Sequence, residues 1–572
     1  MSLKVRCLVG LWVISFLMVV GLGAAVNPPL VEAARNQDRE AVRSLLKENV
    51  DVNSAQPDGA TALAWAAHWD DLETAELLIG AGADLNAAND YSVTPLFLAC
   101  SNRNAAMVEK LLRAGADSNA ALWSGETALM TASRTGNLEV AELLLAHGAH
   151  VNAREPRREQ TPLMWAISFG HPDIAKVLIE QGADVHARTI ELELEGFTPM
   201  VVGGYAADVE ANPKGGYTPL MFAARVGDLA TARLLLARGA DVHVGTQEDG
   251  SPLVVASAGG YQELALFLLE RGADPNVTDA NGISSLHYAL RDGVKVLHGM
   301  DITSSGNSAL AIDDFANRQD SILPGPNMLE LAKALLARGA APNAQLKYAP
   351  PRLRLLRRPI ISLSDATPFF LAAAAADLAS MRMLMESGAE PLMWTTPHQE
   401  ELFKEGHGDD NEIQANVTPL MVAVGMGSFG CRRCRAREFT EAAEERAVEA
   451  ARVLLRLGAD INEANATGWT PMHAAAYAGA NSLVEFLVEN GATVNVQNGC
   501  GQTPLSLAEG KSARGLVQKL APHQSTAELL RKLGAGTTPL SDPVGQCVLG
   551  RADLDFYRGK EPEEEKGTAQ EN

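Results

Sequence analysis

The chain has 572 residues, of which 47% are apolar and 5% aromatic, and its 48 Lys and Arg against 70 Asp and Glu give a formal net charge of −22. This apolar content excludes a wholly disordered chain, whereas the low aromatic content argues against one large aromatic-packed core. Several domains or a repeat array are expected instead. The acidic balance argues against nucleic-acid binding as the main role, because that affinity depends on Lys and Arg displacing counterions from phosphates.

The N-terminus has the order of a secretory signal peptide over residues 1–25. Two cations precede an apolar run over 8–20, and small residues follow up to Ala25. We expect cleavage after Ala25, which would place the exported chain in the periplasm or outside the cell. An uncleaved anchor is the alternative, because residues 8–26 are almost long enough to cross a bilayer. The Asn27-Pro28-Pro29 sequence that follows favours cleavage.

A repeat fills most of the remaining chain. A start signature, Thr-Pro-Leu or a close variant, alternates with an end signature, Gly-Ala-Asp-x-Asn or a close variant, and successive starts such as Thr61 and Thr94 are 33 residues apart. The start signatures begin at Thr61, Thr94, Thr127, Thr161, Thr218, Ser251, Ser284, Thr367, Thr418, Thr470 and Thr503. The end signatures begin at Gly82, Gly115, Gly148, Gly182, Gly239, Gly272, Gly339, Gly388, Gly458 and Gly491.

Each repeat reads as two helices followed by a hairpin loop. The Thr hydroxyl can cap the first helix, Pro at the next position presets φ, and Leu begins the buried stripe. A glycine such as Gly136 then breaks the first helix, and an apolar run such as 138–145 predicts the second. The Gly of the end signature is expected in the left-handed conformation that stops a helix, and the Asp and Asn favour the turn that follows.

The period and the two signatures resemble the ankyrin-repeat family over residues 28–535. The resemblance implies an all-α solenoid of stacked helix pairs with projecting hairpins, whose hairpins and first helices line a concave surface that binds another protein. Stacking is also expected physically, because one such unit cannot bury its apolar faces alone. The histidine that the family uses to bridge loops occurs only at His287 and His473. The exported arrays that this chain resembles are bacterial.

The signatures also predict the domain boundaries. Residues 26–53 read as an N-terminal capping helix pair with Asn49 in place of glycine, 54–535 as about eleven repeats, and 536–572 as a polar, disordered tail. Departures from the regular spacing locate insertions near 189–216, 294–327, 344–366, 393–416 and 426–446, the first of which holds an isolated start motif at Thr198. Such loops either carry binding function or reflect tolerated drift. The basic stretch 347–358 fits an anionic partner or, as we favour, the protein's own carboxylates.

Several aromatic residues fall on the expected binding surface. The resemblance implies that partner contacts come from the hairpins and from the seventh and eighth residues after the start Thr. These positions hold Trp69, Tyr91, Trp123, Phe169, Tyr217, Trp469 and Tyr477. Exposed aromatics are enriched in protein interfaces, although the same rings can instead pack against the next repeat. Trp65 and Trp165 lie on the stripe between repeats and are expected to be structural.

The chain offers few motifs for chemistry. The Gly-x-Gly-x-x-Gly pattern at 425–430 follows a helix rather than a strand, so it lacks the context of a dinucleotide site. Cys431 and Cys434 lie beside four arginines, which favour thiolates; the pair fits a disulfide closing the inserted loop, free thiols, or a redox or metal function. A zinc site would need two further ligands, and the sequence has no second such Cys pair.

We therefore expect a secreted, non-enzymatic scaffold that binds another protein. It is expected to be a monomer with no catalytic residue, metal or cofactor, no nucleic-acid partner and no membrane span after signal removal. The alternative is a thiol-redox or metal-binding protein that uses Cys431 and Cys434 while the repeats position a partner.

Overall fold

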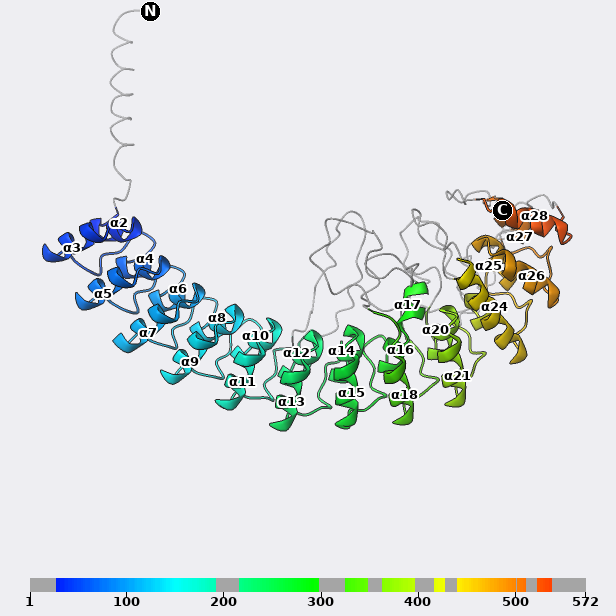
Figure 1. Cartoon of the computed structure of the whole chain (residues 1–572), viewed down its shortest axis with the longest axis horizontal. Coiled ribbons are helices and arrows are strands. Elements are labelled where there is room, and N and C mark those ends of the chain that lie inside the picture. The colour runs from blue at the N-terminus through cyan, green and yellow to red at the C-terminus, as the bar shows by residue number, and fades with distance from the viewer. Residues whose placement is uncertain are drawn as a thin grey trace, which may run out of the picture. The chain divides into compact units, whose positions relative to one another are not determined.

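The computed structural model describes residues 27–191, 215–297, 325–347, 363–396, 416–426, 440–499, 501–510 and 522–536. Two compact units divide these residues: the first ends at Asp241, and the second begins at Val242. The described residues form helices, with only isolated β-bridges in some hairpin loops. Within each unit the helices stack in pairs (Figure 1), so the predicted all-α repeat fold is confirmed. None of the described helices combines the length and apolarity needed to cross a bilayer.

The first unit, where described, contains six helix pairs. The first helices have seven or eight residues and the second helices nine or ten. The pairs are α2 (Pro29–Arg35) and α3 (Arg39–Lys47), α4 (Ala62–His68) and α5 (Leu72–Gly80), α6 (Pro95–Ser101) and α7 (Ala105–Ala114), α8 (Ala128–Thr135) and α9 (Leu138–Ala146), α10 (Pro162–Ser168) and α11 (Pro172–Glu180), and α12 (Pro219–Val226) and α13 (Leu229–Ala237). First helices contact first helices, as α4 contacts α2 and α6, so each pair covers the apolar face of its neighbour.

The second unit repeats this plan with interruptions. Its described helices are α14 (Pro252–Gly259), α15 (Gln262–Glu270), α16 (Ser285–Ala289), α17 (Arg291–Leu297), α18 (Leu329–Ala337), α20 (Pro368–Ala374), α21 (Leu378–Glu386), α23 (Pro419–Ala423), α24 (Glu441–Arg456), α25 (Pro471–Ala478), α26 (Asn481–Glu489), α27 (Pro504–Ala508) and α28 (Gln524–Lys532). The isolated start motif at Thr198 and the central parts of the predicted insertions lie outside the described residues.

The start signature caps the first helices, as predicted. The Thr94 hydroxyl oxygen accepts a hydrogen bond from the backbone N–H of Phe97 (3.2 Å), and Pro95 is the first residue of α6. Thr61 caps α4 in the same way, through the N–H of Ala64 (3.3 Å). Each such cap satisfies a backbone donor that the helix leaves open and contributes about 1 kcal/mol.

Left-handed residues end the helices, also as predicted. Gly82 and Gly148, in the end signature, have φ of 86° and 85°, and Gly136 ends α8 with a φ of 78°. Asn49 takes the same conformation, with a φ of 53°, after α3. Glycine suits this conformation because it has no Cβ to clash with the backbone, and Asn tolerates it.

The Asn of the end signature joins successive repeats, which the sequence did not lead us to expect. The Oδ1 of Asn119 accepts from the N–H of His150 (2.7 Å), and its Nδ2 donates to the carbonyl of Gly148 (3.0 Å). The Oδ1 of Asn152 accepts from the N–H of Asp184 in the following repeat (2.7 Å). The same backbone acceptance occurs at Asn53, Asn86, Asn276, Asn343, Asn462 and Asn495. These bonds hold neighbouring hairpins in register within each unit.

His473 and His287 bridge neighbouring loops, as the resemblance implies. The Nδ1 of His473 accepts from the N–H of Thr470 (3.2 Å), and its Nε2 lies 3.1 Å from the carbonyl oxygen of Gln502. The Nε2 of His287 lies 3.1 Å from the carbonyl oxygen of Ala344. Burial lowers the pKa of both imidazoles to about 4, so both rings are neutral at pH 7.

Helix α17 is an addition to the repeat plan, at a place where the spacing predicted an insertion. Its first residue, Arg291, is fully buried, and its guanidinium donates to the carbonyl oxygens of Tyr288 (3.2 Å) and Ser257. Burial lowers the pKa of Arg291 to about 10. The N–H of Asp292 donates to the Oδ1 of Asn327 (2.8 Å), so the start of α17 is joined to the residues just before α18.

Candidate protein-binding surface

Four of the seven predicted contact residues are exposed, and all four lie in the first unit. The exposed fractions are 44% for Trp69, 62% for Tyr91, 74% for Trp123 and 53% for Phe169. Trp69 and Phe169 directly follow the first helices α4 and α10, whereas Tyr91 and Trp123 lie in hairpin loops. The repeat register therefore presents large rings to solvent on two kinds of element.

Trp69 is held in place by its own repeat and the one before it. Its Nε1 donates to the carbonyl of Arg35 (3.0 Å), and its ring stacks on Trp65 with the centroids 6.3 Å apart. Trp65 is half-buried, donates to the Oε1 of Gln56 (3.0 Å) and carries the guanidinium of Arg35 over its ring at 5.5 Å. A ring fixed in this way loses little side-chain entropy when a partner binds.

Phe169 has a comparable arrangement on α10. Its ring lies 6.2 Å, between centroids, from that of the half-buried Trp165. Trp65 and Trp165 thus each pack against an exposed ring that directly follows the same helix. This is the position that a supporting residue between repeats takes.

Main-chain bonds align the hairpin tips of the first unit. The N–H of Asp90 donates to the carbonyl of Asp58 (2.8 Å), and the N–H of Trp123 donates to the carbonyl of Tyr91 (3.4 Å). Each tip is itself closed by backbone bonds, such as that from the N–H of Leu122 to the carbonyl of Glu126 (2.9 Å). Tyr91 and Trp123 therefore belong to adjacent tips, and the side chains there project from a connected backbone.

The other three predicted residues are less accessible. Tyr217 and Tyr477 are half-buried, and Trp469 is only 7% exposed, so Trp469 does not fit the predicted surface role. The ring of Trp469 packs against those of His473 and Tyr477, with 5.9 Å between centroids in both cases. Trp469 directly precedes Thr470, the N-cap of α25, and its ring packs on side chains of that helix. Trp394 of the second unit, which we did not predict, is 51% exposed.

The predicted thiol pair is not described by the structure. Cys431 and Cys434 both lie outside the described residues, so the alternatives for them stay predictions. Cys100 is described as a free, fully buried thiol in α6. Burial raises its pKa to about 12, which removes the thiolate that nucleophilic or metal chemistry needs.

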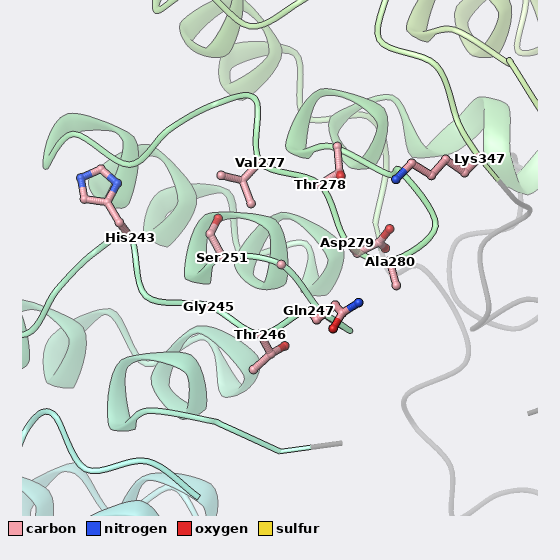
Figure 2. Close-up of a pocket in the computed structure, with 11 residues that line it drawn as sticks. His243, Gly245, Thr246, Gln247, Ser251, Val277, Thr278, Asp279, Ala280 and Lys347 are labelled. Carbon is pink, nitrogen blue, oxygen red and sulfur yellow. The ribbon is translucent and has the colours of Figure 1, made fainter. Parts of the chain in front are cut away.

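A polar hollow lies in the second unit where successive hairpins meet (Figure 2). It is lined by His243, Gly245, Thr246, Gln247, Gly250, Ser251, Val277, Thr278, Asp279, Ala280 and Lys347. The Asp279 carboxylate is buried and accepts from the backbone N–H groups of Asn281 and Ile283 and from the hydroxyl of Tyr288, each at 2.9 Å. Burial raises its pKa to about 6. Both carboxylate oxygens of Asp279 therefore accept hydrogen bonds from the chain itself.

The described residues contain no group of three or more His, Cys, Asp or Glu side chains arranged to hold a metal ion.

Asp279 belongs to a turn that recurs in other repeats. Asn89, Asn465 and Asn498 each accept from the N–H four residues later, as Asp279 does from Ile283. We did not predict this turn from the sequence, although Asp279 and the three Asn residues each lie five residues before a start Thr or Ser.

Comparison with known families and proteins agrees with this geometry. The family described as "Ankyrin repeats (3 copies)" matches residues 30–121, 96–189, 194–279 and 439–540. The Notch-regulated ankyrin repeat-containing proteins of Xenopus tropicalis and Xenopus laevis are 30% and 29% identical over 105 residues, which cover 18% of this chain and 90% of each relative. Ankyrin repeats suggest a scaffold for protein–protein interaction. The capped helix pairs and the matched residues show that the chain belongs to the ankyrin-repeat family.

Proposed function

We propose that the chain is an exported, non-catalytic scaffold that holds another protein against the first unit. The observation that carries this proposal is the set of four exposed rings, Trp69, Tyr91, Trp123 and Phe169, on regularly stacked repeats. Large aromatic side chains dominate the energy of protein interfaces, and a few such residues often each contribute about 2 kcal/mol or more. A scaffold that is already ordered keeps most of that energy as affinity.

Export is supported by the charged, apolar and small-residue order of residues 1–25. The proposal places a bacterial chain in the periplasm or outside the cell, as a monomer that starts at Val26 after cleavage. N-terminal sequencing of the protein from the envelope fraction tests this directly. A chain that retains Met1 and stays in the cytoplasm would contradict it.

The absence of catalysis is a separate part of the proposal. The strongly perturbed groups Asp279, His287 and His473 are all engaged in hydrogen bonds within or between repeats. Perturbed pKa values at such positions follow from burial in a structural network and need no substrate. A Cys431→Ser, Cys434→Ser variant tests the rival thiol function, because loss of the biological activity with intact partner capture would favour that rival.

The binding surface is tested by replacing Trp69, Tyr91, Trp123 and Phe169 together by Ala. We expect partner capture from the envelope fraction to fall more than tenfold while the helical circular-dichroism signal stays unchanged. Trp394→Ala is the matched control, since it removes an equally exposed ring from the second unit. Unchanged capture by the fourfold variant would contradict the surface assignment.

A further inference from the structure

We infer that the first unit binds an extended, arginine-containing cationic segment of its partner along the tip row, defined as Asp58, Asp90, Tyr91 and Trp123. The inference rests on the proposed scaffold function and names the chemistry of the segment that it recognises. Two properties of the tip row carry it: exposed carboxylates on two adjacent tips, and exposed rings on two adjacent tips.

The backbone places the four residues on three consecutive hairpin tips. Asp90 is bonded through its N–H to the carbonyl of Asp58, and Trp123 through its N–H to the carbonyl of Tyr91, so three consecutive tips touch. All four residues are exposed. An extended segment lying along the tips would therefore meet carboxylates first and aromatic rings next.

The charge around the tip row is strongly negative. Residues 51–127 contain eleven Asp and Glu but only three Lys and Arg. Five of these carboxylates form ion pairs: those of Glu76 and Glu109 with Lys110 and Arg113, and those of Asp71, Glu73 and Glu126 with arginines outside this range. The other six form no ion pair within the described chain; they belong to Asp51, Asp58, Asp70, Asp84, Asp90 and Asp117. Neither Asp58 nor Asp90 forms an ion pair within the described chain. Such a surface attracts a cationic partner and repels an acidic one.

The two rings favour arginine over lysine. Where the structure is described, the rings of Tyr91 and Trp123 have no cation and no other ring against them. Trp65 provides an example of a cation on a ring in this unit, because the guanidinium of Arg35 lies 5.5 Å from the centroid of the Trp65 ring. A guanidinium can stack on a ring and bind a carboxylate through two N–H groups at once, which an ammonium cannot.

The tip that follows Trp123 contains Pro156, Arg157 and Arg158 and limits the length of the tip row. Gly125 lies against Pro156, because a Cβ on Gly125 would come within 2.1 Å of the Pro156 ring, and the exposed residues Arg157 and Arg158 follow directly. Their charge opposes the continuation of a cationic segment past Trp123. The segment is therefore expected to span the tips from Asp58 to Trp123 and no further.

The experiment measures fluorescence anisotropy of labelled peptides on the full exported chain. The probes are a peptide that alternates four Arg with Ser, and matched peptides with Lys or Glu in place of Arg. We expect the Arg peptide to bind at least threefold more tightly than the Lys peptide, and the Glu peptide not to bind. Affinity for the Arg peptide should fall with added salt.

Two double variants divide the tip row into its parts. Tyr91→Ala with Trp123→Ala should remove the preference for Arg over Lys, and Asp58→Asn with Asp90→Asn should weaken both cationic peptides about tenfold. The control, Glu142→Gln with Glu180→Gln, removes two exposed charges from second helices of the same unit and should change affinity less than twofold. Exposed positions seldom affect stability, and circular dichroism checks that each variant is folded.

The results separate this inference from the proposed function. Equal binding of Arg and Lys peptides, or binding that neither double variant weakens, would overturn the inference even if the fourfold aromatic variant loses its natural partner. The opposite result would overturn the proposed scaffold surface but not the inference: the Arg peptide binds at the tip row, yet the fourfold aromatic variant still captures the natural partner as well as the unmodified chain does.

Discussion

The Nε2 of His473 lies 3.1 Å from the carbonyl oxygen of Gln502, 29 residues later in the chain, and so joins two repeats. A carbonyl only accepts, so Nε2 carries the proton. The Nδ1 of the same ring accepts from the N–H of Thr470. The ring therefore works as a bridge only in its neutral form, because a proton on Nδ1 would replace an acceptor by a donor.

The two bridging histidines predict a loss of stability in mild acid. The folded pKa of His287 and of His473 is about 4, against an ordinary value of 6.5, so the unfolded chain binds more protons between these values. The free energy of unfolding should fall as the pH is lowered from about 6.5 to about 4. Chemical denaturation across this range measures it. Met occupies the same register at Met164 and Met221, so His287→Met with His473→Met should flatten the dependence; an unchanged slope would contradict the assignment.

Asp279 predicts a stabilising substitution. Its folded pKa of about 6 exceeds the ordinary 3.8, so the buried carboxylate costs stability above pH 6, and this cost disappears as the pH falls below about 4. Asn occupies the corresponding turn position at Asn89 and Asn465. Asp279→Asn should therefore raise the melting temperature at pH 7 and have little effect near pH 4. Differential scanning calorimetry of both proteins at pH 7 and pH 4 measures these melting temperatures. A lower melting temperature for Asp279→Asn than for the unmodified chain at pH 7 would count against this interpretation.

Two glycines with the same backbone conformation should respond differently to alanine. A Cβ on Gly136 would lie 2.3 Å from the His171 ring, whereas one on Gly82 would meet nothing within 4 Å. Gly82→Ala should cost only the left-handed conformation, about 1 kcal/mol. Gly136→Ala should cost more, because His171 must also move. Urea denaturation of both variants measures the difference, and equal losses would show that the contact with His171 is unimportant.

Burial separates two tryptophans that occupy hairpins. Trp469→Ala should cost about 3–5 kcal/mol, since it removes a buried ring and leaves a cavity. Trp123→Ala should change stability by less than about 0.5 kcal/mol, because its ring is exposed. Thermal denaturation compares the two variants, and similar losses would mean that the ring of Trp123 is also packed.

Local chemistry explains why the sequence predicts the fold so closely. The cap at Thr94 and the left-handed glycine at Gly82 depend on residues within a few positions in the chain, so both can be read from the sequence. Exposure depends on groups from other repeats. Trp123 and Trp469 both lie beside hairpins in the sequence, but Trp469 directly precedes its start Thr whereas Trp123 lies four residues before Thr127, and only the structure shows that one projects into solvent while the other packs on His473.

The features that were missed are those whose partners lie in another repeat. The recurrence of Asn in the end signature was visible, but the acceptor and donor that Asn119 binds belong to the following repeat. Arg291 gives no local signal of burial, because its bond to the carbonyl of Ser257 reaches the preceding first helix. Only the assembled stack supplies these groups.

Two bonds between successive hairpin tips of the first unit, from Asp90 to Asp58 and from Trp123 to Tyr91, involve only main-chain atoms. A main-chain bond of the same kind occurs in the second unit, where the N–H of Ala280 donates to the carbonyl of Glu248 (3.1 Å). At these tips the main-chain atoms hold neighbouring loops together, whereas the exposed side chains are open to a partner. Evolution, or an engineer, can rewrite the residues displayed at the tips and change what is recognised while the stack beneath them persists.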